Sequence, residues 1–274
     1  MNEEIIRLEP LVSFVNTCHE GWLKGWHERN GGNLSYRLCT EDLAPFLPFL
    51  SLESDYRPID TSLPSLGNDF FLITGSGKFM KNVKVDPESN IGMVQIHPDG
   101  NAYRKVWGFK EGAHPSSELL SHLMTHAVKK EKMTESSCAL LHAHPANLIA
   151  LSFVLPLNEP SFSKELWEML SECIVVFPEG LGVLPWILPG SIDLAQATQT
   201  LMERFNAVLW AHHGVFCAGS SLDLAFGLVD TLEKAAEILV KVLSMGGKKQ
   251  KPSSLQLLSL AEKYLLPVNK ACLD

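Results

Sequence analysis

Apolar residues near the start of the chain recur at spacings of three and four, which is the period of an amphipathic helix. The pattern predicts a helix over residues 4–28, ended by the turn-forming sequence Asn30-Gly31-Gly32-Asn33. Residues 34–38 then alternate between apolar and polar types, as a strand does. The polar, proline-bearing segment that follows, at about 39–69, predicts a long loop or insertion.

Later in the chain, short apolar runs are interspersed with longer amphipathic segments. The short runs predict strands at 70–74, 92–96, 102–107, 138–144 and 174–177, and a strand pair spanning 208–217. Helical spacing predicts helices at 146–155, 162–170, 192–204, 222–245 and 255–264, and another that begins at Ser116-Ser117 with a serine as its cap. Because the strands occur in hairpin-like runs, the predicted fold class is α/β. We expect a single domain over residues 1–274, with a mostly antiparallel central β-sheet covered by helices on both faces.

Composition and charge narrow the class of protein. Of the 274 residues, 46% are hydrophobic and 20% charged, as in ordinary globular proteins, and the net charge of −8 argues against a nucleic-acid or membrane partner. The short run Lys248, Lys249 and Lys251 is interpreted as a solvated turn. An acidic amino terminus, with no long apolar run after it, predicts a cytoplasmic protein. Six cysteines without a Cys-x-x-Cys pair predict reduced thiols.

Histidines end two of the predicted strands. His142-Ala143-His144 follows an apolar run, and alternation in a strand sends positions i and i+2 to the same face, so the two imidazoles are expected to point together. A second apolar run ends in His212-His213. One of these would complete a three-histidine site with an open fourth position, which is typical of catalytic zinc. Alternation alone does not choose between them, and hydrogen-bonded core histidines are the alternative for an isolated His-x-His pair.

Glu118 lies at the predicted start of the helix that follows Ser116-Ser117. A carboxylate at this position commonly complements the helix dipole and the exposed amides. If the helix start faces the histidines, the same carboxylate could move protons at a metal-bound substrate. The residues alone leave both roles open.

Three short segments have the chemistry of an anion site. Thr74-Gly75-Ser76-Gly77-Lys78 follows a predicted strand and offers amides, a hydroxyl and an ammonium group, although Leu72 stands where a Walker A loop requires glycine. Asn30-Gly31-Gly32-Asn33 places two side-chain amides beside a permissive backbone, and Ser116-Ser117 lies at a helix amino terminus. A plain turn explains each segment by itself, but together they would form a phosphate cradle if the fold joins them.

Taken in order, these motifs resemble those of the class II aldolase/adducin family. The motifs are Asn30-Gly31-Gly32-Asn33, Thr74-Gly75-Ser76-Gly77-Lys78, Ser116-Ser117-Glu118, His142-Ala143-His144 and His213-Gly214. The resemblance extends over nearly the whole chain. Within the family, segment 22–29 and the long segment before Phe70 look like those of members that cleave a 1-phosphorylated deoxyketohexose.

The resemblance implies a lyase that performs metal-dependent aldol cleavage. It implies one Zn²⁺ per subunit held by His142, His144 and His213, with Glu118 as the catalytic acid/base and His212 as a neighbour. The residues implied to bind the phosphate are Asn30, Asn33, Ser76, Gly77, Ser116 and Ser117. A second catalytic glutamate, Glu172, would reach the aldehyde end of the substrate from an adjacent subunit of a ring-like homotetramer. Without the resemblance, Glu172 could equally be a solvent-facing acid beside a helix.

Two alternatives stand beside this hypothesis. Another chemistry of the same family, such as cleavage of a stereoisomeric deoxyketose phosphate or epimerisation of a pentulose phosphate, would use the same metal triad. A non-catalytic interaction module of the adducin type would keep the fold without the chemistry. The retained histidines and Glu118 argue against this module.

Overall fold

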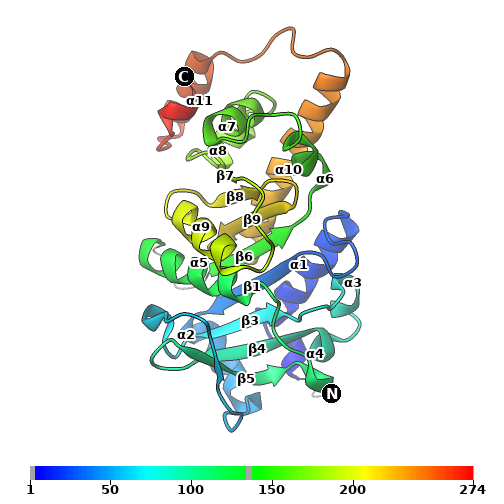
Figure 1. The fold of residues 1–274 in the computed structure, drawn as a ribbon, viewed down its shortest axis with the longest axis vertical. Coiled ribbons are helices and arrows are strands. Elements are labelled where there is room, and N and C mark those ends of the chain that lie inside the picture. The colour runs from blue at the N-terminus through cyan, green and yellow to red at the C-terminus, as the bar shows by residue number, and fades with distance from the viewer. Residues whose placement is uncertain (1–3, 134–137, 274) are drawn as a thin grey trace.

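A nine-stranded sheet forms the centre of the protein (Figure 1). The structure is a computed structural model that describes residues 4–133 and 138–273. The strands are β1 (Asn33–Leu38), β2 (Arg57–Pro58), β3 (Phe70–Thr74), β4 (Ile91–Ile96), β5 (Ala102–Gly108), β6 (Cys138–Ala143), β7 (Gly182–Leu184), β8 (Ala207–Trp210) and β9 (Gly214–Gly219). Their order across the sheet is β2-β5-β4-β3-β1-β6-β9-β8-β7. Every neighbouring pair is antiparallel except β7–β8, which is parallel.

Helices cover both faces of the sheet (Figure 1). On one face, α1 (Leu11–Leu23), α6 (Ala146–Leu151) and α10 (Leu222–Ser244) share a core cluster with β1 and β6. On the other face, α5 (Leu119–Lys132) and α9 (Ile192–Met202) pack on β3, β4, β6 and β8. The other α-helices are α2 (Thr40–Leu43), α3 (Met80–Val83), α4 (Pro87–Asn90), α7 (Glu159–Trp167), α8 (Glu172–Val176) and α11 (Ser254–Lys263). The predicted fold class, a mostly antiparallel sheet with helices on both faces, is confirmed.

Alternation along the two central strands decides which side chains reach which face. Leu141 of β6 joins the cluster shared with α1 and α10, whereas Leu140 joins the cluster on the α9 side. In β1, Leu34 packs toward α1 and α10, so Asn33 and Ser35 face α5. All residues of β1 are buried. A polar strip therefore lies between the centre of the sheet and α5.

The prediction of a strand at 174–177 is wrong. This segment belongs to helix α8 and the turn after it. Its β-branched residues favour a strand locally, but Cys173 and Ile174 both bury in the core that α7 and α10 also line. Two consecutive side chains that bury in the same cluster suit one turn of a helix, because a strand would send them to opposite faces.

Other boundaries also differ from those predicted. The first long helix begins only at Leu11, because Pro10 stands at its start and has no amide hydrogen to continue a helix on its amino-terminal side. Neither Ser116 nor Ser117 caps α5. Glu118 is the N-cap residue and makes no side-chain cap, because residues 116–118 form a turn in which Ser116 Oγ accepts from the Glu118 amide.

The segment at 39–69, predicted as a loop or insertion, contains short elements. It includes α2, β2 and the 3₁₀-helices η2 (Ala44–Phe49) and η3 (Pro64–Leu66). Three more 3₁₀-helices, η1 (Ile5–Arg7), η4 (Lys110–Gly112) and η5 (Lys270–Cys272), lie elsewhere among the described residues. Phe46 and Leu66 are fully buried, so this segment contributes to the core as well as to the surface.

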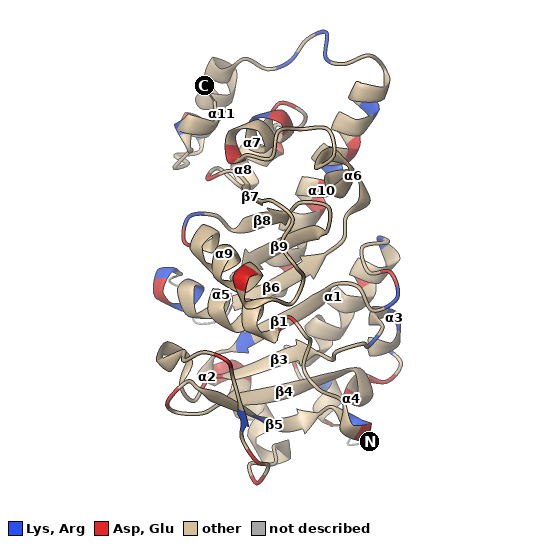
Figure 2. Cartoon of the chain, in the orientation of Figure 1, with Lys and Arg blue, Asp and Glu red and all other residues tan. Residues whose placement is uncertain are grey.

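Charged residues are spread along the elements in both signs, as Figure 2 shows, rather than gathered in one basic stripe. All six cysteines are free thiols. In the part of the chain that the structure describes, no helix has the length and apolar character needed to cross a membrane.

Candidate active site

One cavity collects residues from five separate parts of the chain. It is lined by Asn30, Gly31, Gly32, Asn33, Gly75, Ser76, Gly77, Ser116, Ser117, Glu118, His142, His144 and His213. The sheet explains this meeting, because β1 and β6 pair with Asn33 opposite His142, and β9 pairs with the other edge of β6 directly after His213. The fold therefore brings together every site residue predicted from the sequence except Glu172.

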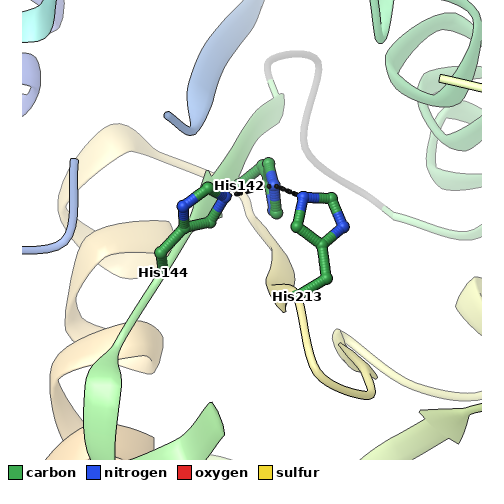
Figure 3. A group of neighbouring side chains, drawn as sticks. All are labelled: His142, His144 and His213. Carbon is green, nitrogen blue, oxygen red and sulfur yellow. Dashed lines mark hydrogen bonds between the residues drawn. The ribbon is translucent and has the colours of Figure 1, made fainter. Parts of the chain in front are cut away.

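Three histidines point toward one another in this cavity (Figure 3). His142 Nε2 lies 3.1 Å from His144 Nε2 and 3.3 Å from His213 Nε2, and the three candidate ligand atoms all lie within 4.8 Å of one another. In a tetrahedral zinc site with Zn–N bonds of about 2.0–2.1 Å, two ligand nitrogens are roughly 3.3–3.4 Å apart. The His142–His144 and His142–His213 nitrogen pairs therefore have nearly the spacing of two ligands on one small metal ion.

The outer nitrogens of two rings determine where their lone pairs point. His142 Nδ1 lies 3.0 Å from the Val215 carbonyl oxygen, and His144 Nδ1 lies 2.7 Å from Glu28 Oε1. Each Nδ1 must donate to its oxygen, and a neutral imidazole has only one N–H, so both Nε2 atoms carry a lone pair. Two lone pairs facing each other cannot form a hydrogen bond, whereas a shared metal ion would satisfy both.

Burial keeps the rings of His142 and His213 in the neutral form that binds metal. Burial, together with His144 and His213, holds the pKa of His142 well below its usual range, and burial with His144 lowers the pKa of His213 to about 4. Neutral imidazole is the ligating form. Burial would raise the pKa of Glu28, but its hydrogen bond to His144 and nearby charges lower it overall, so a carboxylate stands behind His144.

Glu118 is buried beside the histidines, with 7% of its surface exposed. Its Oε2 atom lies 3.7 Å from His142 Nε2 and accepts a hydrogen bond from Asn33 Nδ2 at 2.7 Å. Burial raises the pKa of Glu118, and the Asn33 hydrogen bond and His144 partly offset this effect. A raised pKa brings a carboxylate closer to the value that suits a general base at neutral pH. The helix start thus faces the histidines.

The candidate phosphate-binding loops meet at the same cavity. Several of the backbone amides in these loops donate to other groups of the protein. The Gly31 amide donates to Glu28 O, the Ser76 amide to His114 O, and the Ser116 amide to Thr74 O. Side-chain amides and hydroxyls, together with any remaining free amides, are therefore the groups available for an anion.

The turn between β8 and β9 separates the two adjacent histidines. His212 has a φ of +63°, its ring packs against Phe153, and its Nδ1 lies 3.1 Å from Ser152 Oγ. His213 lines the cavity instead. The structure thus distinguishes two residues that strand alternation could not.

Glu172 lies apart from the histidine cavity. It is an exposed residue of α8 and lines a different cavity with Ser171, Val175, Leu260 and Tyr264. Within one chain it does not reach the three histidines. Any role in the same reaction would require a second copy of the chain.

Two supporting residues were missed by the sequence analysis. Glu28 contacts His144, as described above. His27 is buried beneath the asparagine–glycine turn, where an added Cβ at Gly32 would lie 2.3 Å from His27 Nδ1 and 2.7 Å from the His142 carbonyl oxygen. Gly32 also has a φ of +71°, which favours glycine. The glycine pair was the one sequence signal of this close packing.

Comparisons with known proteins identify the family of this chain. The family described as "Class II Aldolase and Adducin N-terminal domain" matches residues 12–240. A rhamnulose-1-phosphate aldolase from Pectobacterium atrosepticum is 46% identical over 250 residues, which cover 91% of both chains. A rhamnulose-1-phosphate aldolase from Klebsiella pneumoniae is 43% identical over 260 residues, covering 95% of this chain and 94% of the relative.

A solved structure of an aldolase is also similar to this chain. A sugar-phosphate aldolase from Thermotoga maritima is 31% identical, has a TM-score of 0.70, and covers 86% of this chain and 95% of its own. The aldolases of this family are metal-dependent lyases, in agreement with the three converging histidines. The family match spans all the motifs that line the cavity, from Asn30 to His213. This chain therefore belongs to the class II aldolase and adducin family.

Proposed function

We propose that this chain is a zinc-dependent lyase that cleaves L-rhamnulose 1-phosphate reversibly to dihydroxyacetone phosphate and L-lactaldehyde, a step of rhamnose catabolism. The proposal is carried by one observation: three histidines, a buried glutamate and three loops with anion-binding chemistry share one cavity. Identity of 43–46% to rhamnulose-1-phosphate aldolases supports this choice of substrate. The cytoplasmic location stays a prediction from the sequence.

His142, His144 and His213 would hold the zinc ion. Three nitrogen ligands and an open position match the ligand set of catalytic zinc. When bound, the ion would supply positive charge that stabilises the negative charge developing on the substrate as the carbon–carbon bond breaks. Glu28 would keep His144 in the tautomer whose Nε2 faces the site, because its carboxylate accepts from His144 Nδ1.

The substrate phosphate would lie at the loop side of the cavity. The groups that would bind it come from Asn30, Asn33, Ser76, Gly77, Ser116 and Ser117. Helix α5 begins at Leu119, two residues after Ser117, and a helix start attracts negative charge. A phosphate held there would fix the reacting carbons against the histidines and so convert binding energy into orientation.

Glu118 would move the proton on the ketose-phosphate side of the broken bond. Cleavage of the C3–C4 bond leaves its electron pair on C3, so dihydroxyacetone phosphate forms only when C3 gains a proton, and the reverse reaction removes it. Two features of Glu118 support this role. It is buried next to His142, and its pKa is raised mainly by burial. A carboxyl group in this position can give and take the same proton in the two directions.

A proton must also leave the C4 hydroxyl as the aldehyde forms. We assign this end of the substrate to Glu172 of an adjacent subunit, in a ring-like homotetramer. The exposed position of Glu172 on α8 is compatible with contact to a neighbouring chain. Large apolar side chains left exposed in the monomer, among them Phe153 (69%), Trp186 (58%) and Leu188 (62%), also favour assembly.

The proposed substrate can be tested with purified protein and two stereoisomeric deoxyketose phosphates. Release of dihydroxyacetone phosphate from L-rhamnulose 1-phosphate and from L-fuculose 1-phosphate would be followed through a coupled dehydrogenase. We expect kcat/KM to favour L-rhamnulose 1-phosphate by at least about tenfold. Equal or reversed preference would contradict the substrate choice. No cleavage of either sugar by zinc-loaded protein would favour the non-catalytic module instead.

A further inference from the structure

A polar strip behind the proposed acid/base is unusually well buried. Asn33 and Ser35 alternate along the face of β1 that meets α5, and α5 carries His122 and His126 one turn apart on the facing side. Asn33 is 7% exposed, Ser35 is 1% exposed, and both histidines are fully buried. These polar groups lie in a place where a core would ordinarily be apolar.

These side chains form one continuous hydrogen-bonded chain that ends at Glu118. His126 Nε2 lies 2.8 Å from Ser35 Oγ, and Ser35 Oγ lies 2.6 Å from His122 Nδ1. His122 Nε2 contacts Asn33 Oδ1. Asn33 Nδ2 then donates to Glu118 Oε2 at 2.7 Å. Four contacts thus connect the interior of the sheet to the cavity.

The order of donors and acceptors in this hydrogen-bonded chain is determined by Glu118, at its cavity end. A carboxylate only accepts, so the nitrogen of the Asn33 amide must face Glu118 and its oxygen must face His122. The proton of the His122 ring therefore sits on Nε2. Burial lowers the pKa of His122 to about 3, so the ring is neutral and its Nδ1 accepts from the Ser35 hydroxyl. Ser35 Oγ in turn accepts from His126 Nε2.

We propose that Ser35 and His122 are positioning residues that hold the Asn33 amide with its nitrogen toward Glu118. His126 anchors these hydrogen bonds in the core. All donors in this series of hydrogen bonds point toward Glu118, so each bond polarises the next. If the Asn33 amide rotated by half a turn, its oxygen would face the Glu118 carboxylate and repel it. The chain prevents this rotation and thereby fixes the carboxylate beside His142. The kinetic part of this inference rests on the proposed function.

Substitution of Ser35 tests the chain at its middle link. Ser35→Ala removes one oxygen from a fully paired position, and Ser35→Thr returns a hydroxyl. Thr125→Val is the matched control, because Thr125 is fully buried on α5, the helix that carries His122 and His126, and its Oγ1 has no hydrogen-bond partner among the described residues. We expect Ser35→Ala to lower kcat for L-rhamnulose 1-phosphate by about 10- to 100-fold, as small misplacements do. KM should change much less.

Ser35→Thr should recover part of the lost kcat, and Thr125→Val should keep the parent's kcat. If kcat of folded, zinc-loaded Ser35→Ala equals that of the parent, the positioning role is wrong. An equal loss of kcat in Thr125→Val would also overturn it, because the effect would then come from any change in this part of the core.

Neutron diffraction of the deuterated, zinc-loaded protein tests the donor order without using activity. The inference predicts deuterium on His122 Nε2, none on His122 Nδ1, and the Asn33 amide nitrogen facing Glu118. Deuterium on His122 Nδ1 with none on Nε2, or an Asn33 oxygen facing Glu118, would refute the proposed order of donors. Parent protein that cleaves no sugar phosphate would contradict the proposed function alone, and the neutron map would still decide the donor order.

Discussion

Replacing Glu118 by glutamine removes proton transfer while leaving the shape of the side chain. The carboxylate is 7% exposed, 3.7 Å from His142 Nε2, and bonded to Asn33 Nδ2 at 2.7 Å. A glutamine oxygen can accept the same hydrogen bond, so the Asn33 contact survives. The substitution also removes a group whose pKa burial raises, so little stability depends on its charge. The proton affinity of the side chain is what disappears.

The expected loss of rate follows from the role of a positioned acid/base. Such a group contributes about 10²–10⁴-fold, which corresponds to roughly 3–5 kcal/mol of transition-state stabilisation. If Glu118 only complemented the dipole of α5, the change would cost about 0.3–1 kcal/mol of stability and leave turnover nearly normal. The two roles therefore predict opposite patterns in rate and stability.

The assay combines cleavage rates with zinc content and thermal melts of the same preparations. Glu118→Gln should bind zinc like the parent, melt at a similar temperature, and lose most of its kcat with little change in KM. Turnover within about threefold of the parent, far short of the acid/base range, would refute the assignment.

Three further predictions address the surroundings of the site. Gly32→Ala should lower thermal stability by at least about 1–2 kcal/mol and reduce zinc content, since the new Cβ would meet His27 and the left-handed backbone disfavours it. Hybrids that mix Glu172→Ala and Glu118→Ala chains should regain activity if Glu172 acts across an interface, whereas proven hybrids without recovery would contradict that role. Below about pH 6.5, the free energy of unfolding should fall by up to about 1.4 kcal/mol per pH unit for each buried neutral imidazole. Burial lowers the pKa of His122 to about 3, so the stability that its neutral ring contributes is present above about pH 6.5 and is lost as pH falls. In His122→Phe, the free energy of unfolding from denaturant titrations should therefore fall less steeply with decreasing pH than it does in the parent.

Much of the fold could be predicted because most of its strands are short, largely apolar segments that are buried on both faces. The alternation of β6 also predicted that His142 and His144 point together, and their Nε2 atoms lie 3.1 Å apart. The prediction failed at 174–177, where local β-branched composition was outweighed by the burial of two consecutive residues against α7 and α10. Local propensity gave no information about that packing.

The site was predicted less completely for two physical reasons. The choice between His212 and His213 depends on a backbone turn, in which the left-handed conformation of His212 is a property of the folded loop. The chain from His126 to Glu118 depends on which face of α5 meets β1, and the packing of a helix on a strand is not local in sequence. Short-range spacing therefore reveals the individual histidines but not their connection.

The central claim is that a metal ion held by the three histidines is required for sugar-phosphate cleavage. Its most direct test is a zinc titration of chelator-stripped protein, with the initial rate of dihydroxyacetone phosphate release from L-rhamnulose 1-phosphate as the signal. We expect almost no rate without zinc and a linear rise that breaks at about one zinc per chain, the capacity of one three-nitrogen site. His212→Ala should give the same curve, because that side chain lies outside the cavity, and His213→Ala should give none. Full activity in the stripped protein, or a zinc-loaded protein that does not cleave the sugar, would contradict the account.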